Sequence, residues 1–390
     1  MLCLLISCGP KLDKVERYVE GGVEVVINHL EPYKIKGEPS TLHLEEEFTI
    51  DTERDEIVEL GLTDIWGFDV DSEENIYFFK PPLSQEKLIY KFNRDGKFIT
   101  SFGQRGQGPG EIQYASYIRI TKNGEIPVID AYQHKVLFFD KNGNILKETR
   151  FEYLNLAGGQ IIPLENGNFL VRTVETGIRK IGEPPPEEGD NIFLSIINSE
   201  FKIIKVIDVL HLSRQLLETR NPYVMPVYFW EVSDRNIYVG NSQWGYEIRV
   251  FDLNGNLLKK IKKKEYKRVK FPKEIKEDYK RMTENPASPL YGIKIAFPDY
   301  QPPFWRLFFT DDDGRLFLMT FEKGKNSREY IFDIFNSDGV FIRRIRLDAY
   351  IDRYTIVFPL YATAKNNRLY CLREKESGYK ELVVYKMKWE

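Results

Sequence analysis

The chain has 390 residues, which is long enough for one large domain or two domains of ordinary size. Aromatic residues make up 14% of the chain, and they suit the half-buried faces of β-sheets. The formal net charge of −3 is close to neutral, so the composition gives no overall electrostatic reason to expect a nucleic-acid or anionic-membrane partner.

Three cysteines occur, at Cys3, Cys8 and Cys371, and no C-x-x-C pair is present. The sequence therefore gives no support to a zinc site or a disulfide framework. Cys371 lies in an apolar run, and we expect it to be a small core residue.

The first residues are apolar, and Leu5 to Cys8 resembles a bacterial lipobox, in which the cysteine is acylated after signal cleavage. We expect residues 1–8 to be a signal remnant and Cys8 to carry a lipid anchor in the cell envelope. The alternative is a frayed apolar N-terminus. Residues 1–8 lack the usual positive segment and their apolar run is short, which an upstream start codon would explain. No later stretch approaches the ~20 apolar residues of a transmembrane helix, so membrane contact is expected only through this anchor.

A turn followed by an apolar strand recurs along most of the chain. It occurs six times, beginning at Asp71, Lys122, Glu165, Asp234, Asp312 and Lys365. A strand that ends in a hairpin turn alternates with it and occurs five times, beginning at Tyr90, Phe138, Ile196, Val250 and Ile334. Asp-Gly and Asn-Gly pairs in these turns predict type I′ hairpins.

A repeat of roughly 40–50 residues that holds four short strands is typical of a propeller blade. We predict an all-β, six-bladed β-propeller in which strand a lies innermost and strand d outermost. The predicted blades cover residues 62–103, 114–153, 158–209, 225–263, 304–347 and 357–390.

The sixth blade lacks a strand d, because the sequence ends at Glu390. An unpaired outer strand would leave an exposed edge. We predict that residues 42–50 pair with the last strand and close the ring. Residues 23–27 form another strand candidate, either outside the ring or packed under the first blade. Residues 9–61 are thus an N-terminal arm, and residues 62–390 are the propeller.

The longest connection, residues 264–303, contains a helix that begins at Pro272. Ile275, Tyr279 and Met282 share one face of it and are expected to pack on the propeller. The lysines and arginines of residues 259–281 point outward, and we expect them to form a solvated face that nearby Glu and Asp partly offset. The alternative is a basic patch that binds an acidic glycan, a phosphorylated surface or lipid headgroups.

Residues 91–112 resemble the NHL repeat, with a strand ending in Phe-Asn-Arg-Asp-Gly, then Phe102-Gly, then Gly108-Pro-Gly-Glu. Residues 129–140 resemble the strand pair that follows in such repeats. The chain is similar to bacterial six-bladed propeller lipoproteins. The resemblance implies the fold, but it says little about function, because such propellers include binding proteins and several enzyme classes.

The longest connections join strands b to c or strands d to a, and in a propeller both types emerge on one face. Such crowding favours a binding surface on that long-loop face. Aromatic and cationic residues near the predicted starts of strand a are candidate ligand contacts for a glycan, peptide or protein partner: Trp66, Tyr117, Tyr228, Trp230, Trp305, Arg306 and Tyr361. The alternative is that about half of these side chains pack between blades.

No catalytic motif is found. The four histidines are scattered, and no G-x-S-x-G elbow or EF-hand spacing occurs. We therefore expect a non-catalytic binding or scaffold propeller of the cell envelope, without a cofactor and without a nucleic-acid partner. The alternative is a calcium-dependent hydrolase, lactonase or lyase of the six-bladed type, for which the carboxylates near the axis would be Asp64, Asp69 and Glu231.

Overall fold

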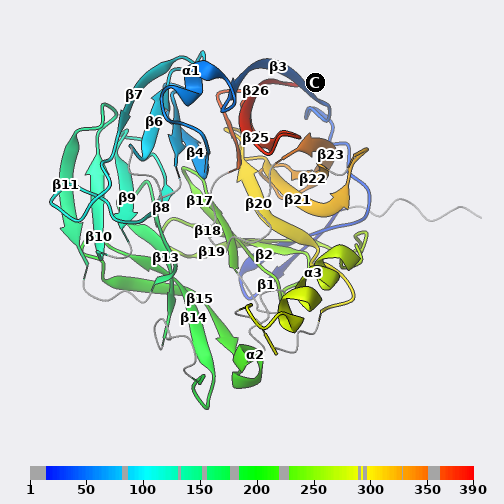
Figure 1. The fold of residues 1–390 in the computed structure, drawn as a ribbon. Helices are drawn as coiled ribbons and strands as arrows, with labels where there is room; N and C mark the ends of the chain where they lie inside the picture. Colours follow the sequence, from blue (N-terminus) through cyan, green and yellow to red (C-terminus); the bar gives the residue numbers. More distant parts are fainter. Residues whose placement is uncertain are drawn as a thin grey trace, which may run out of the picture.

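The structure is a computed structural model that describes residues 15–80, 87–130, 133–151, 156–175, 184–218, 228–288, 291–292, 297–326, 328–349 and 361–390. Its strands form six small sheets around a common centre (Figure 1), which confirms the predicted six-bladed propeller. No helix in these ranges is long and apolar enough to cross a membrane.

The first three blades follow the predicted order from the inner to the outer strand. Blade one consists of β4 (Gly67–Val70), β5 (Ile76–Phe79), β6 (Ile89–Phe92) and β7 (Phe98–Phe102). Blade two consists of β8 (Ala115–Ile118), β9 (Ile126–Asp130), β10 (Lys135–Phe139) and β11 (Ile145–Arg150). Blade three consists of β12 (Leu156–Pro163), β13 (Phe169–Val174), β14 (Asp190–Ile197) and β15 (Ile203–Leu212), followed by α2 (Arg214–Glu218).

Of the other three blades, blade four is extended by two further strands and blade six takes its outer strand from the N-terminal arm. Blade four consists of β16 (Tyr228–Val232), β17 (Asn236–Asn241), β18 (Glu247–Asp252) and β19 (Leu257–Lys263). Blade five consists of β20 (Phe304–Thr310), β21 (Leu316–Lys323), β22 (Glu329–Phe335) and β23 (Phe341–Asp348). Blade six consists of β24 (Ala362–Lys365), β25 (Arg368–Glu374), β26 (Lys380–Trp389) and, as its outer strand, β3 (Leu42–Asp51). The short helix α1 (Asp55–Val58) leads from β3 to blade one.

The ring closes as predicted. β3 pairs antiparallel with β26, from Asp51 opposite Glu381 to Leu42 opposite Trp389 (Figure 1). The N-terminal arm thus supplies the outer strand of blade six, and the edge of β26 is covered.

The strand predicted at residues 23–27 lies outside the ring. β2 (Val23–Asn28) pairs in parallel with β19 of blade four, and β1 (Glu16–Glu20) pairs with β2. The side chain of Asn28 is fully buried; it donates to the carbonyl oxygens of Gly339 (2.9 Å) and Lys262 (3.2 Å) and accepts from the Phe341 amide (2.7 Å). This side chain therefore holds blade four to blade five.

The repeated hairpin turn is set by its first side chain. The carboxylate of Asp140 accepts from the amides of Asn142 and Asn144, each at 2.8 Å. The same two contacts recur from Asn93, Asn198 and Asp252. An Asp or Asn at this position satisfies turn amides, which explains why the phrase recurs.

The predicted type I′ conformation is wrong for the Asp-Gly and Asn-Gly turns. Only the glycine has a positive φ, as at Gly143 (86°), and the register shifts beside it between Phe138 and Phe139. This pattern fits a longer loop with a glycine bulge, which the dipeptide alone does not distinguish from type I′. Asn366 and Asn367, with φ of 51° and 57°, do fit the two-residue type I′ pattern.

The core lies between blades. Five clusters of buried apolar side chains are present among the described residues, and each spans neighbouring blades. The largest runs through blades five, six and one, with Phe332, Tyr370 and Phe68 among its members. Blade stacking is thus the main source of apolar burial, as the repeat predicts.

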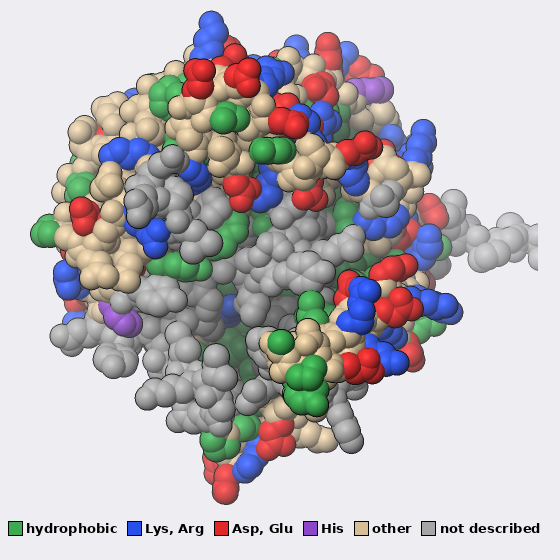
Figure 2. Space-filling model, in the orientation of Figure 1, with side chains coloured by type: hydrophobic (Ala, Val, Ile, Leu, Met, Phe, Trp, Pro, Cys, Tyr) green, Lys and Arg blue, Asp and Glu red, His purple; other side chains and the backbone are tan. Residues whose placement is uncertain are grey.

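The predicted helix is α3 (Lys273–Glu284), with Pro272 at its N-cap. Tyr279 is buried, and its ring contacts Phe297 of the same insertion. Met282 is 39% exposed, so its predicted packing on the propeller is wrong. Acidic and basic side chains are mixed over α3 (Figure 2), and ion pairs such as Lys280 to Glu284 (3.9 Å) connect them. This mixture favours the solvated face over a basic patch.

The lysines of β19 have a different role from the one expected. Lys260 pairs with Glu20 of β1 at 2.6 Å, and Lys259 lies 3.6 Å from Glu24 of β2. Lys263 is buried rather than exposed, and its Nζ lies 2.8 Å from Asp333 of blade five. These lysines therefore attach the N-terminal arm and blade five to blade four.

Candidate functional site: a polar cavity on the propeller axis

A cavity of about 420 Å³ lies where the inner strands of all six blades end. Its wall includes residues that lie in the inner strand of each blade or directly after it: Asp69, Arg119, Pro163, Glu231, Thr310 and Thr363. The a–b turns that follow these strands form the mouth. The cavity therefore opens on the face of the short turns, opposite the long-loop face.

Three charged side chains of the cavity wall come from blades one, two and four. We call these residues, Asp69, Arg119 and Glu231, the axial triad. One guanidinium nitrogen of Arg119 lies 3.5 Å from Oε1 of Glu231, and another donates to the carbonyl oxygen of Val232. Oδ2 of Asp69 accepts from the amide of Ile120 at 2.7 Å. The triad thus links three blades and also faces open space.

The carboxyl group of Glu231 has an unusually high pKa. Burial raises its pKa from 4.5 to about 7, and the nearby charge of Asp69 adds to this effect. The guanidinium of Arg119 acts in the opposite direction. The group is therefore divided between its neutral and charged forms near pH 7 and can donate or accept a hydrogen bond.

The mouth of the cavity carries charges of both signs, with a run of three aspartates and with Lys122, Arg235 and Lys365 elsewhere in the lining. Asp311, Asp312 and Asp313 come from one turn, where Arg315 lies 3.0 Å from Asp311 and 2.6 Å from Asp313. Burial raises the pKa of Asp311, although Arg315 opposes that shift. This acidic run is thus partly neutralised by an arginine of its own turn.

The candidate residues on blade four pack within the molecule. Tyr228 is fully buried, and its hydroxyl donates to Asp208 at 2.6 Å. Trp230 is half-buried, and the guanidinium of Arg172 lies 5.5 Å from its ring centre. Both belong to the cluster that joins blades three and four. A ligand-binding role for either residue stays a prediction.

Trp66 and Tyr361 also lie in packed positions. Trp66 stacks on Phe79 with ring centres 6.3 Å apart and contacts the edge of Tyr114. Tyr361 is 4% exposed within the cluster of blades five, six and one. Tyr117, Trp305 and Arg306 lie in the strands β8 and β20, but their side chains lie outside the described part, as does Cys8 entirely.

The axial triad was only partly visible in the sequence. Asp69 and Glu231 stood out as carboxylates near the axis, whereas Asp64 lines no part of the cavity and pairs with Lys380 at 2.9 Å. Arg119 could not be picked out in the sequence. Each of three blades contributes one residue to the triad, and the repeated turn-and-strand pattern does not mark that position. Much of the long-loop face falls on residues 81–86, 176–183, 219–227 and 350–360, outside the described ranges.

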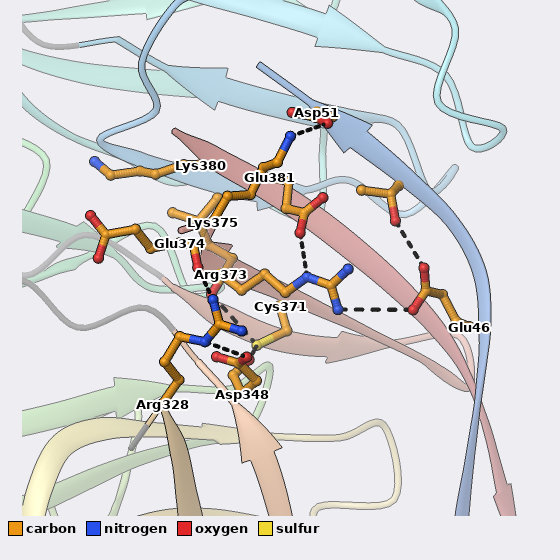
Figure 3. Close-up of polar contacts among 12 residues, drawn as sticks. Glu46, Asp51, Arg328, Asp348, Cys371, Arg373, Glu374, Lys375, Lys380 and Glu381 are labelled. Atoms are coloured by element: carbon orange, nitrogen blue, oxygen red, sulfur yellow. Dashed lines mark hydrogen bonds and ion pairs between the residues drawn. The ribbon is translucent and has the colours of Figure 1, made fainter. Parts of the chain in front are cut away.

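A second polar cluster lies at the seam between β26 and β3 (Figure 3). Arg373 pairs with Glu381 at 2.5 Å, and Lys375 lies 2.8 Å from Asp51. The thiol of Cys371 is buried beside them and donates to the carbonyl oxygen of Asp348 at 3.3 Å; burial raises its pKa. The charges here pair with one another and Cys371 is a core residue, as expected, so this seam is structural.

No cluster of three or more His, Cys, Asp or Glu suited to a metal ion is found among the described residues. In the axial triad, the guanidinium of Arg119 contacts Glu231. A cation bound there would have to compete with that guanidinium.

Comparisons with known proteins agree on the fold. A family model described as a 6-bladed beta-propeller, DUF5128, matches residues 71–229. No curated protein matches the chain.

Two solved structures from Bacteroides each have a TM-score of 0.50. One is a protein of Bacteroides fragilis described as exported, with 14% identity over 93% of this chain and 99% of that one. The other is a DUF4221 member of Bacteroides vulgatus, with 13% identity over 90% and 100%. A virginiamycin B lyase of Staphylococcus aureus matches at a TM-score of 0.43, with 13% identity over 88% and 99%. At these identities the likeness to the two Bacteroides structures shows the fold alone.

Proposed function

We propose that this chain is a non-catalytic binding propeller that works outside the cytoplasm and holds a small, hydroxyl-rich ligand such as a sugar in the axial cavity. The observation that carries the proposal is the axial triad, in which charged side chains from three blades face a cavity of about 420 Å³. Ligand sites commonly occupy roughly 300–1,000 Å³ and use a few convergent polar groups.

The lining suits hydroxyl groups better than a strong charge. Carboxylates accept from hydroxyls, and the guanidinium of Arg119 and the hydroxyls of Thr310 and Thr363 can donate to ligand oxygens. Because Glu231 has a pKa of about 7, it can offer a donor or an acceptor at neutral pH. A sugar presents both kinds of partner in a small volume.

The location outside the cytoplasm rests on two separate supports. The structural neighbour from Bacteroides fragilis is described as an exported protein. The lipobox-like run before Cys8 adds a proposed lipid anchor in the cell envelope. A glycan, peptide or protein partner on the long-loop face is a separate part of this proposal, distinct from the small ligand of the axial cavity.

A sugar panel tests the proposal. Galactose, mannose, N-acetylglucosamine and cellobiose would be screened by thermal shift, and each positive would be measured by calorimetry. At pH 8, where Glu231 is mostly charged, we expect Glu231→Gln to weaken binding at least tenfold. Glu247→Gln is the matched control, because Glu247 is equally buried in blade four but lines no part of the cavity. Failure of every sugar to raise the melting temperature would contradict a hydroxyl-rich ligand.

The alternative is a calcium-dependent hydrolase, lactonase or lyase. A calcium ion bound in the native state would raise the melting temperature relative to a chelator. The contact between Arg119 and Glu231 leads us to expect a shift of less than about 1 °C between calcium and EDTA. A clear calcium-dependent rise would favour the enzyme.

A further inference from the structure

The mouth of the axial cavity is bordered by all six blades. Each a–b turn contributes to the lining, and one residue from each turn, in the order of blades one to six, is Ser72, Lys122, Glu165, Asp234, Asp312 and Asn366. The axial triad lies deeper than these turns, because Asp69 and Glu231 belong to inner strands and Arg119 directly follows one. A ligand that enters by the mouth therefore passes the ring of turns before it meets the triad.

The turns around the mouth are joined to one another. The amide of Lys122 in blade two donates to the carboxylate of Glu165 in blade three at 3.1 Å. The amide of Asn366 in blade six donates to Asp312 of blade five at 2.5 Å. The side chain of Asn366 also donates to the carbonyl oxygen of Ser72 in blade one, at 3.5 Å. Each of these contacts uses a backbone group, which limits how far the turns can move apart.

The junctions between blades are filled as well. Among the described residues, the five apolar clusters together cover all six junctions. The largest covers those between blades five, six and one, and the other four clusters cover one junction each. The ring itself is closed by the pairing of β3 with β26 (Figure 1). A ligand therefore reaches the cavity along the propeller axis and not from the side of the ring.

The cavity is small for a ligand site. Its volume of about 420 Å³ lies in the lower part of the range of roughly 300–1,000 Å³ that is typical of ligand pockets. A sugar chain that folded back on itself would have to place two segments side by side in this volume, whereas the end of a chain places only one. The enclosed mouth and the small volume thus favour the end of a chain over its middle.

The chemistry of the triad favours the same choice. A sugar at the end of a chain has one more free hydroxyl than a sugar within the chain, where a glycosidic oxygen takes its place. A hydroxyl can donate a hydrogen bond, but a glycosidic oxygen has no hydrogen to donate. In its charged form, Glu231 offers acceptors at the depth that the first sugar to enter would occupy. The extra hydroxyl of a terminal sugar supplies a donor there.

We propose that the axial cavity binds the terminal sugar of a glycan chain and not a segment from the middle of the chain. This inference rests on the proposed function, since it begins from a hydroxyl-rich ligand in this cavity. The rest of the chain passes outward through the ring of turns into solvent. The number of ends does not grow with the length of a chain, so binding per chain should not depend on length.

A length series measured by calorimetry tests the proposal. The probes are β-1,4-linked chains of two, four and six units of galactose, mannose, N-acetylglucosamine or glucose, in each series whose two-unit chain raises the melting temperature. We expect dissociation constants per chain that agree within about twofold across the three lengths. Binding of inner segments, or threading of the chain through the ring, would strengthen with length. A gain of about threefold or more from two to six units would overturn the proposal.

Capped chains give a second readout. A four-unit chain with a bulky dye at its reducing end and a benzyl group on the 4-hydroxyl of its other end has no free end. This doubly capped chain should bind at least tenfold more weakly than the uncapped chain. Equal binding of the two chains would overturn the proposal, because inner sugars would then be sufficient.

A variant of the mouth connects the binding to this cavity. Ser72→Trp narrows the mouth at an exposed turn position and should weaken binding of the four-unit chain at least fivefold. Ser199→Trp is the matched control and should bind as the natural chain does, since Ser199 is exposed in a turn of blade three that lines no part of the cavity. Equal binding by the two variants would overturn the proposal.

The outcomes separate this proposal from the proposed function. If no sugar of any series binds, the proposed function fails and the chain-end proposal fails with it. If sugars bind in the cavity but affinity per chain grows with length, the proposed function stands and only the chain-end proposal is overturned.

Discussion

Two clusters of buried charge show how similar side chains can serve different purposes. Between blades four and five, Asp333 accepts from the Tyr246 hydroxyl (2.6 Å), from Lys263 (2.8 Å) and from Arg344 (2.7 Å). On the axis, Glu231 has one arginine at 3.5 Å and faces a cavity. The first cluster has its partners inside the protein, whereas the second leaves hydrogen-bonding capacity for a ligand.

The electrostatics of the two clusters follow this difference. Burial lowers the pKa of Lys263 and raises that of Tyr246, and contact with Asp333 keeps the lysine charged and the tyrosine neutral. For Glu231, the largest cause is burial without enough compensation, so its pKa rises to about 7. A buried charge that is fully paired stabilises one arrangement, whereas a poorly paired one beside a cavity marks a candidate site.

The largest expected effect comes from breaking the paired cluster. Asp333→Asn leaves Lys263 and Arg344 buried without a full counter-charge and should lower the free energy of unfolding by about 3–5 kcal/mol. Urea unfolding measures this loss. Ligand binding in the axial cavity should be unchanged in the folded fraction. A loss below about 1 kcal/mol would mean that this cluster is not a structural anchor.

A somewhat smaller effect is expected for Glu231→Gln on the axis. This substitution should raise the free energy of unfolding relative to the natural chain at high pH. The pKa of Glu231 is higher in the folded protein than its ordinary 4.5, so the folded state binds more protons between about pH 4.5 and 7. The stability of the natural chain should therefore fall as pH rises through that window, by on the order of 3 kcal/mol. Glu231→Gln should remove this part of the decline.

Urea unfolding at pH 5 and pH 8 measures the difference. Compared with the natural chain, Glu231→Gln should be relatively more stable at pH 8 than at pH 5. Glu247→Gln serves again as the control for the loss of a buried carboxylate in blade four. An unchanged pH dependence in Glu231→Gln would show that Glu231 titrates normally, and the contrast between the two clusters would fail.

The smallest of the three effects is expected at Asn28, whose uncharged side chain joins blades four and five. Asn28→Ala removes three side-chain hydrogen bonds at the junction of blades four and five and should cost about 1–3 kcal/mol. Protease sensitivity of the arm, measured beside thermal unfolding, would locate the loss. If the arm stays resistant and the melting temperature does not change, Asn28 is not a clamp.

Most of the fold could be predicted because its signals are local. The side chain of Asp140 satisfies amides two and four residues away, so each hairpin is visible in a short segment. The lack of a last strand in blade six pointed to residues 42–50. The attachment of β2 to blade four could not be predicted, since it depends on a register with Lys259 to Lys263 that no local pattern specifies.

The site was harder to predict than the fold. Long loops directed attention to one face, and the aromatic residues chosen there include Tyr228, which is fully buried. The axial triad combines residues as far apart in sequence as Asp69 and Glu231, and Arg119 belongs to no motif. Only closure of the ring brings the ends of six inner strands to one cavity.

The most direct test of the axial site is a crystal structure of the protein with the tightest-binding sugar of the panel. We predict that the sugar lies in the axial cavity, with its hydroxyls bonded to Glu231 and Arg119. A sugar bound instead on the long-loop face, beside Trp66, Trp230 or Trp305, with the axial cavity free of ligand, would contradict this account.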